Sequence, residues 1–194
     1  MQKKVLCFGE VLWDAFGDVK KAGGAPMNVA RHLAQQGIGV QLASRLGADV
    51  PGDELTGFLK STGLYSTLIQ QDEDLPTCEV TVQLDAHKQA TYVIPEPVSW
   101  DNIAANDDLI TAAKKAQAIV FGSLACRGGI TRNTLRTMLD ESSALKVFDV
   151  NLRAPHYRKE IIETLINQAQ VVKMNNDEAD LLISGSGSLQ DKVT

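Results

Sequence analysis

The chain has 194 residues, of which 44% are hydrophobic and 22% charged, a composition typical of a soluble globular protein with one sizeable core. Its 24 acidic and 19 basic residues give a net charge of −5, and no lysine or arginine cluster could neutralise a phosphate backbone, which argues against nucleic acid as a partner. No uncharged stretch approaches the roughly 20 residues of a membrane helix and the first residues lack a signal-peptide core, so we expect a cytoplasmic protein that does not enter a membrane.

Short apolar runs rich in β-branched residues alternate with longer amphipathic runs, which predicts parallel strands linked by helical crossovers. The first predicted elements are strand Val5–Phe8, helix Met27–Gln36, strand Val40–Ser44 and helix Asp53–Thr62, which ends at Gly63. Further on, buried strands are predicted at Ala118–Phe121, Lys146–Val150 and Val171–Met174, and helices around Thr131–Glu141, Lys159–Gln168 and Asp177–Ile183. The pattern is that of an α/β protein with a doubly wound sheet.

Residues 65–98 interrupt this alternation. Thr77–Leu84 and Ala90–Ile94 have the period of half-exposed antiparallel strands, joined by a polar turn at Asp85–Lys88. They predict a small separate sheet, which could serve as a lid that closes over a pocket and excludes water. The plain alternative is a solvent-facing hairpin without a role.

Cysteine and histidine give no sign of a metal site. Cys7, Cys78 and Cys126 are far apart and none belongs to a Cys-x-x-Cys pair, so we expect buried free thiols in a reducing compartment. The three histidines share no metal-ligand spacing, and we assign them no role; they are His32, His87 and His156.

Polar residues gather just after the predicted strands. They are Asp14, Ser123, Asp149, Asn151 and Asn175. In open α/β sheets ligands bind outside the carboxyl ends of the strands, so these positions are expected to converge on one pocket.

The densest local signal is the segment Ala22–Asn28, which reads AGGAPMN and leads into a predicted helix. Paired glycines let the backbone approach a ligand closely, while Asn28 can both donate to and accept from a hydroxyl group. That chemistry suits a polyhydroxylated ligand. The structural alternative is a glycine-rich turn that only feeds a helix.

The run Gly23–Ala30, followed by Gly37 and Gly47, resembles the first signature of the PfkB (ribokinase-like) family of carbohydrate kinases. Further matching segments follow in family order: Gly9–Asp14, Leu46–Asp49 with Gly52, Gly122–Ala125, Phe148–Arg153 and Asn175–Glu178. Within the family, Trp13-Asp14, Ser99-Trp100-Asp101 and Asp149–Arg153 look most like the fructokinase branch.

The resemblance implies a ribokinase-like fold, in which a mostly parallel sheet lies between two helical layers and carries a small β-sheet lid. Residues 1–194 would form the N-terminal part of such a kinase domain, with lid strands roughly within residues 10–22 and 65–98. Family members commonly dimerise through the lid, so a homodimer is expected, because pairing would bury an apolar lid face.

The resemblance also implies roles for individual residues. Asp14, Gly23, Gly24 and Asn28 match positions that hold sugar hydroxyl groups, and Arg153 matches an arginine near the pocket that could contact substrate or phosphate. Asp14 alone would otherwise be interpreted as a turn or cap residue, and Arg153 as the partner of a surface acid.

Asn175 and Glu178 match the family's Asn-x-x-Glu motif, which resembles a site that organises phosphate and magnesium, usually through water. ATP and Mg²⁺ are therefore the expected cofactors. Without the family, the same residues are a plain helix start with an acid in the first turn.

The family's catalytic base is an aspartate in a Gly-Ala-Gly-Asp motif, which this sequence lacks; Gly47-Ala48-Asp49 lies inside the first signature instead. No catalytic residue is therefore assigned. We expect the C-terminal ATP-binding part to be absent and the 194-residue chain alone to lack kinase activity.

The implied reaction is ATP-dependent phosphorylation of a sugar hydroxyl, with fructose as the first candidate substrate. Ribose, 2-keto-3-deoxygluconate and nucleosides remain alternatives, because pocket side chains such as Tyr92 are poorly fixed by motif. A sugar-binding protein without catalysis is a further alternative. A dinucleotide-dependent oxidoreductase and a P-loop protein are disfavoured, because neither glycine-rich motif is present.

Overall fold

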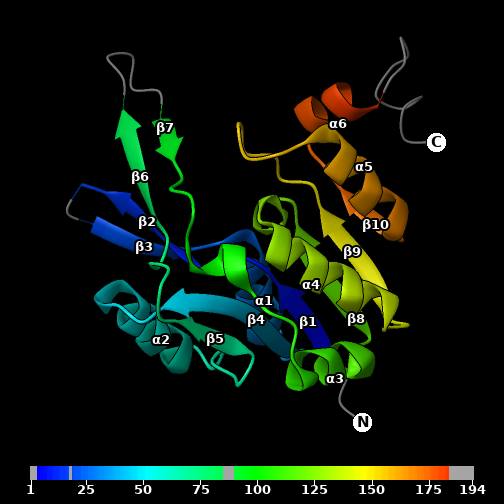
Figure 1. Ribbon diagram of the computed structural model, residues 1–194, viewed down its shortest axis with the longest axis horizontal. Coiled ribbons are helices and arrows are strands. Elements are labelled where there is room, and N and C mark those ends of the chain that lie inside the picture. The colour runs from blue at the N-terminus through cyan, green and yellow to red at the C-terminus, as the bar shows by residue number, and fades with distance from the viewer. Residues whose placement is uncertain (1–3, 18, 85–89, 184–194) are drawn as a thin grey trace.

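The protein, described here from a computed structural model over residues 4–17, 19–84 and 90–183, is built on two sheets (Figure 1). The larger has six parallel strands in the order β10-β9-β8-β1-β4-β5. These are β1 (Lys4–Phe8), β4 (Gly39–Gly47), β5 (Ile69–Asp72), β8 (Ala118–Gly122), β9 (Leu145–Asp149) and β10 (Val171–Lys173). The predicted α/β class is confirmed.

Helices cover both faces of this sheet. One layer consists of α1 (Ala25–Gln35) and α2 (Val50–Ser61), and the other of α3 (Asp107–Lys115), α4 (Gly129–Asp140) and α5 (Lys159–Gln168), while α6 (Asn176–Leu182) follows β10. Side chains of β1 alternate between the two layers: Cys7 packs with α1 and α2, and Leu6 and Phe8 pack with the other three helices. Within the described ranges, no helix has the length and apolar character needed to cross a membrane.

The starts of α1 and α2 differ from the predicted ones for identifiable reasons. α1 begins at Ala25, two residues early, because Pro26 lacks an N–H and fits the first turn of a helix. α2 begins at Val50 because the Asp49 side chain caps it, accepting a hydrogen bond of 2.8 Å from the Gly52 N–H.

The smaller sheet, which we call the lid, stands beside one end of the parallel sheet (Figure 1). Its strand order is β3 (Val19–Gly23), β2 (Leu12–Phe16), β6 (Glu79–Leu84) and β7 (Ala90–Val93). The two hairpins are antiparallel and β2 pairs with β6 in parallel, so the lid joins two separate parts of the chain. The predicted turn at Asp85–Lys88 lies outside the described residues.

Three features of the sheet differ from the prediction. β5, within the segment expected to form the separate small sheet, instead extends the parallel sheet by pairing with β4. α3 was not predicted. β10 is not buried, because it pairs with β9 at the edge of the described sheet and leaves Val171 43% exposed.

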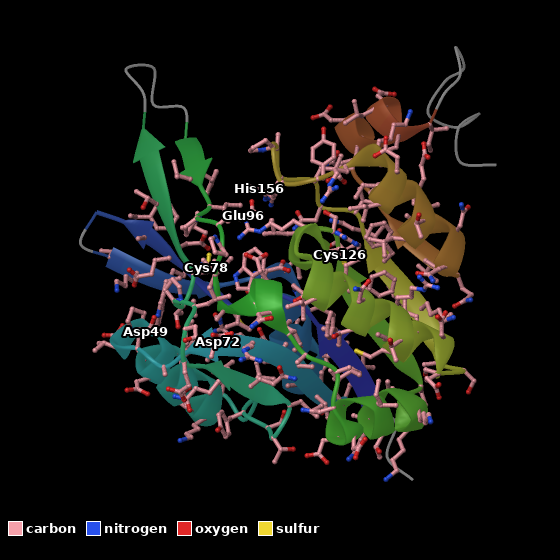
Figure 2. The ribbon with its side chains drawn as sticks, in the orientation of Figure 1. Asp49, Asp72, Cys78, Glu96, Cys126 and His156 are labelled. Atoms are coloured by element: carbon pink, nitrogen blue, oxygen red, sulfur yellow. The ribbon has the colours of Figure 1, made fainter. Side chains whose placement is uncertain are left out.

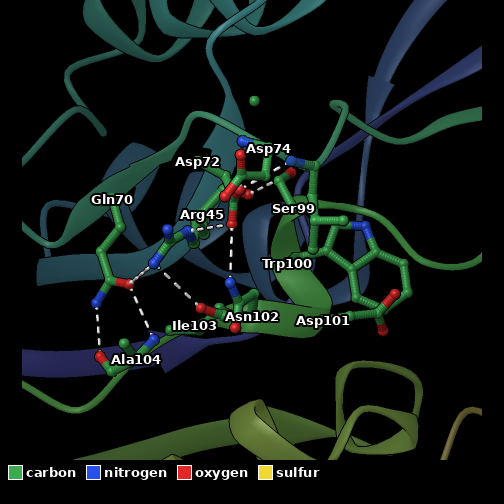
Figure 3. A network of polar contacts seen from close by, with 12 residues as sticks. Arg45, Gln70, Asp72, Asp74, Ser99, Trp100, Asp101, Asn102, Ile103 and Ala104 are labelled. Carbon is green, nitrogen blue, oxygen red and sulfur yellow. Dashed lines mark hydrogen bonds and ion pairs between the residues drawn. The ribbon is translucent and has the colours of Figure 1, made fainter.

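A polar network fastens the chain that leaves the lid to the parallel sheet (Figure 3). The 3₁₀ turn η1 (Ser99–Asn102) follows β7, and Asn102 donates to Asp72 at the end of β5 over 3.1 Å. Arg45 of β4 pairs with the same Asp72 oxygen at 2.6 Å and donates to the Asn102 carbonyl. Although burial alone would raise the pKa of Asp72, these donors and the amides of Asp74 and Leu75 hold it below its usual value. The network fixes where the lid segment re-enters the body.

Candidate functional site

A cavity with a volume of about 600 Å³ lies between the lid, the start of α1 and the carboxyl ends of β1, β8 and β9. This is the edge of the sheet at which ligands bind in open α/β folds, and the volume suits a small ligand. It is lined by Glu10, Leu12, Asp14, Gly24, Ala25, Asn28, Val29, His32, Val80, Tyr92, Ile94, Leu124, Asp149, Asn151 and Arg153.

Asp14 lies on the lid wall of the cavity. Because side chains alternate along β2, Leu12 and Asp14 share the face that lines the cavity, and Trp13 lies on the other face, where its indole N–H donates to the Pro51 carbonyl at 3.0 Å. Partial burial raises the pKa of Asp14, while Lys21 and Arg153 act in the opposite direction. Trp13 thus anchors the strand that presents Asp14.

Gly23 supports Asp14 rather than lining the cavity. A Cβ atom at Gly23 would lie 2.4 Å from the Asp14 Oδ2 atom, so any other residue here would displace this carboxylate from its present position. Gly23 is paired with Leu12 across the β2–β3 hairpin. The close approach of the Asp14 side chain explains why glycine occupies position 23 of the Gly23–Ala30 motif.

The opposite wall is the first two turns of α1. Gly24 and Asn28, two of the candidate sugar-binding residues, line it, and His32 follows one turn later on the same face. Gly24 has φ 113°, and a Cβ there would lie 2.3 Å from the Glu10 carbonyl oxygen. Any other residue at position 24 would therefore require a shift of the backbone.

The floor is formed after β9 by Asp149, Asn151 and Arg153, and three members of the expected polar group, Asp14, Asp149 and Asn151, meet at this cavity. Asp149 forms an ion pair with Lys173 of β10 at 2.9 Å. Asn151 has a positive φ of 39°, a conformation that asparagine tolerates better than most residues. Two members of that group do not line it: Ser123, after β8, borders a separate small cavity with Arg127 and His156, and Asn175 caps α6.

Glu10 is the functional candidate that the motif analysis did not single out. Its side chain is only 1% exposed, and its Oε1 atom accepts a hydrogen bond from the Ala25 N–H at 3.2 Å. The other carboxylate oxygen, Oε2, is buried without a hydrogen-bond partner among the described residues. Burial raises the pKa of Glu10 to about 7; the amides of Glu10 and Ala25 and the charge of Arg153 lower it, and Asp149 raises it.

Asn175 and Glu178 lie outside the residues that line this cavity. They form a capping box at the start of α6, in which each side chain accepts the other's backbone N–H at 2.8 Å. The second Glu178 oxygen accepts from the Leu152 N–H at 2.8 Å, which ties α6 to the loop that carries Asn151 and Arg153. No group of three or more acidic, histidine or cysteine side chains suited to a metal ion occurs in the described ranges.

The site combines carboxyl, amide, imidazole, guanidinium and phenol groups around an open cavity, which is the donor and acceptor set that a polyhydroxylated ligand needs. Besides Glu10, the lining residue His32 had no predicted role, and Tyr92 was expected as a pocket side chain that no motif fixes; their positions depend on which faces of α1 and β7 are turned to the cavity. The cysteines are free and buried, as predicted, and contribute no charge here because burial raises the pKa of each to about 12.

Comparison with known proteins identifies the family. The sequence matches that of the pfkB family carbohydrate kinases over residues 2–193. The chain belongs to this family of carbohydrate kinases, and its ribokinase-like fold agrees with that membership.

Similar proteins carry names of sugar kinases. A putative sugar kinase of Pyrococcus horikoshii is 28% identical over 193 residues, with 90% of this chain and 62% of that protein covered. A probable fructokinase-4 of Arabidopsis thaliana is 28% identical over 197 residues, with 95% and 59% covered. The crystal structure of the Pyrococcus protein in complex with ATP superposes with a TM-score of 0.82 at 28% identity, covering 92% of this chain and 65% of that one.

The chain spans 59–62% of the length of these two curated relatives. A fructokinase of Xylella fastidiosa, 24% identical with a TM-score of 0.84, shares the fold. The part of the relatives that this sequence matches therefore contains both the parallel sheet and the lid.

Proposed function

We propose that this chain supplies the sugar-binding half of a kinase that phosphorylates a sugar hydroxyl with ATP. The observation that carries the proposal is the cavity under the lid, which brings together Asp14, Asn28 and Arg153 from three separate elements. Membership of the carbohydrate kinase family and the ATP complex of the Pyrococcus relative support the reaction class.

In this proposal the chain's own residues bind and orient the sugar. The Asp14 carboxylate would accept hydrogen bonds from two hydroxyl groups, and Asn28 would donate to and accept from a third. Gly24 would let the backbone approach the ligand, and Arg153 would contact the sugar or a phosphate. The reaction's base is assigned to no residue of this chain.

ATP and Mg²⁺ are the proposed cofactors. Both Glu178 oxygens already accept backbone N–H groups, but a carboxylate has further lone pairs with which it can hold water. Because Mg²⁺ retains much of its water shell, Glu178 fits a role through water better than direct ligation. Mg²⁺ would neutralise phosphate charge during transfer.

The charges around the cavity favour a neutral sugar, and fructose comes first among neutral sugars because several relatives are named fructokinases. Its lining contains the carboxyl groups of Glu10, Asp14 and Asp149, and Arg153 is the one arginine or lysine among the described lining residues. An ionised sugar acid such as 2-keto-3-deoxygluconate would bring a further negative charge next to Asp14 and Asp149, which is unfavourable. Ribose and nucleosides are not disfavoured on this ground and remain alternatives.

A coupled assay of ADP release tests the reaction. It should be run with fructose, ribose and 2-keto-3-deoxygluconate on this chain and on the protein encoded by the complete reading frame. We expect turnover of fructose by the longer protein and none by the 194-residue chain. Fructose binding by calorimetry without turnover in either would favour the second candidate, a sugar-binding protein without catalysis.

Replacing Asp14 with asparagine tests the sugar site directly. The amide keeps the shape but loses the charge-assisted hydrogen bonds, so we expect fructose affinity to fall by about 10- to 100-fold. Calorimetric titration at constant pH measures this, with Asp53→Asn as the control, because Asp53 is exposed on α2 away from the cavity. Equal affinity in D14N and wild type would remove Asp14 from the site.

A homodimer formed through the lid is also proposed. The lid leaves apolar side chains largely exposed at Phe16 (46%) and Val19 (66%), which are cross-strand partners on one face of the β2–β3 hairpin, and pairing of two lids would bury them. Light scattering of the full-length protein should give twice the monomer mass, and Val19→Lys should halve it. A monomeric mass for the wild type would contradict the proposal.

A further inference from the structure

Glu10 is a buried carboxyl group that the sugar-binding roles leave unexplained. It follows β1 and lines the cavity, yet its side chain is only 1% exposed and its Oε2 atom has no hydrogen-bond partner among the described residues. A buried acid with an unsatisfied oxygen costs stability, so its presence calls for a local reason.

The reason lies at the start of α1. Its N-cap residue is Gly24, which has no side chain to accept from the first-turn amides, and Pro26 has no N–H at all. Glu10 takes over this task from another part of the chain, because its Oε1 accepts from the Ala25 N–H at 3.2 Å. Its backbone carbonyl also packs against Gly24, where a Cβ would come within 2.3 Å.

We propose that Glu10 is a positioning residue of the sugar pocket, which holds the Gly23–Gly24 turn and the first turn of α1 in place through a neutral side-chain carboxyl group. The inference rests on the proposed sugar site, because that turn carries Gly24 and leads to Asn28. Glu10 itself need not touch the sugar, since its carboxyl oxygens are covered.

Burial, more than the surrounding charges, makes the neutral form of Glu10 the working one. Asp149 and Arg153 act on Glu10 from the loop after β9, Asp14 and His32 line the same cavity from the lid and α1, and Cys78 and Cys126 nearby are neutral thiols. With its pKa raised to about 7 by burial, Glu10 is protonated below that pH. Ionisation would place an unpaired charge beside Asp149.

Sugar binding should therefore depend on pH in a definite direction. A bound sugar displaces water from the cavity and further disfavours the ionised carboxylate, so the pKa of Glu10 is higher in the complex than in the free protein. By linkage, sugar affinity is highest below about pH 7 and falls as pH rises through that value.

Two substitutions distinguish the charge of Glu10 from its side-chain acceptor. Glu10→Gln retains an oxygen that can accept from the Ala25 N–H and carries no charge, whereas Glu10→Ala removes the acceptor. We expect fructose affinity, measured by calorimetry from pH 6 to 8.5, to fall about tenfold in E10A and to stay within about threefold of wild type in E10Q. The fall in fructose affinity as pH rises through about 7, which we call the pH step, should disappear in E10Q. Glu163→Gln and Glu163→Ala, on the exposed face of α5, serve as matched controls.

A second readout does not require sugar. Hydrogen exchange should accelerate at the amides of Ala25 and Asn28 in E10A but not in E10Q, and the carboxyl carbon of Glu10 should titrate near pH 7 in the NMR spectrum of the wild type. If the wild type binds none of the sugars, the proposed function fails while these two measurements still decide the role of Glu10.

Three results would overturn the inference: slow exchange and full affinity in E10A, a Glu10 titration at an ordinary glutamate pH, or a pH step that persists in E10Q. The last would assign the step to another lining group such as His32. If E10A does not fold, E10Q and the wild-type titration remain decisive.

Discussion

Replacing Asp101 with asparagine is expected to lower the free energy of unfolding by about 3–5 kcal/mol, because it removes the buried carboxylate that pairs with Arg127 and leaves, among the described acids, only Glu96, which is 4.0 Å away and 53% exposed. Arg127 donates to both Asp101 oxygens at 2.8 Å, and both side chains are less than 10% exposed. The Asp101 carboxylate also accepts from the Val98 N–H at 3.0 Å. Urea unfolding followed by circular dichroism measures the loss.

The same arginine connects three parts of the chain. It lies over the Trp100 ring at 4.1 Å, donates to the Pro95 carbonyl at 2.6 Å, and lies 3.1 Å from the Nδ1 atom of His156. Figure 2 shows His156, in the loop after β9, beside Glu96, in the segment that leaves the lid. The matched control is Asp140→Asn, which removes the exposed ion pair with Arg136 and should cost less than about 0.5 kcal/mol. A loss below about 1 kcal/mol in D101N would show that the pair is not a major source of stability.

Gly24→Ala should destabilise the protein by about 3 kcal/mol and impair sugar binding as well. The φ of 113° at Gly24 strains any L-residue, and the new Cβ would lie 2.3 Å from a backbone oxygen, which cannot move aside as a flexible side chain could. The effect on binding would arise because the turn must shift within the cavity wall.

Gly57→Ala is the natural comparison for that change. Gly57 lies inside α2, where an added methyl group would meet no other described residue within 4 Å beyond its own helix, so alanine there should stabilise by about 0.5–1 kcal/mol through helix propensity. Thermal unfolding of both variants distinguishes a steric effect from a general response to alanine. Equal stability of G24A and wild type would contradict the close approach.

The parts of the fold that could be predicted are those in which side-chain pattern alone specifies the element. α5 was predicted at its observed bounds, and the buried strand β8 to within one residue. β5 could not be found this way, because Ile69–Asp72 contains three polar residues and its strand conformation is imposed by backbone pairing with β4. α3 could have been found: Asn106 caps it, acids begin it and lysines end it.

The residues of the site likewise divide into those that the sequence could predict and those that it could not. Asp14, Asn28 and Arg153 follow from motif spacing, and the structure brings them to one cavity. Glu10 stood within a quoted motif but gave no signal of its own, because its burial and its contact with Ala25 depend on how two separate segments pack. Its one sequence signal is a charged residue directly after a buried strand, flanked by Gly9 and Val11.

The parallel pairing of β2 with β6 bears on how the chain folds. Trp13 pairs with Glu79, whereas the β2–β3 hairpin involves only neighbouring residues. Between the two hairpins the chain must first lay down β4 and β5, so closing this loop carries a large entropic cost until the body holds both ends. The lid is consequently a late product of folding, and newly made chains expose the apolar face of the first hairpin until the second arrives.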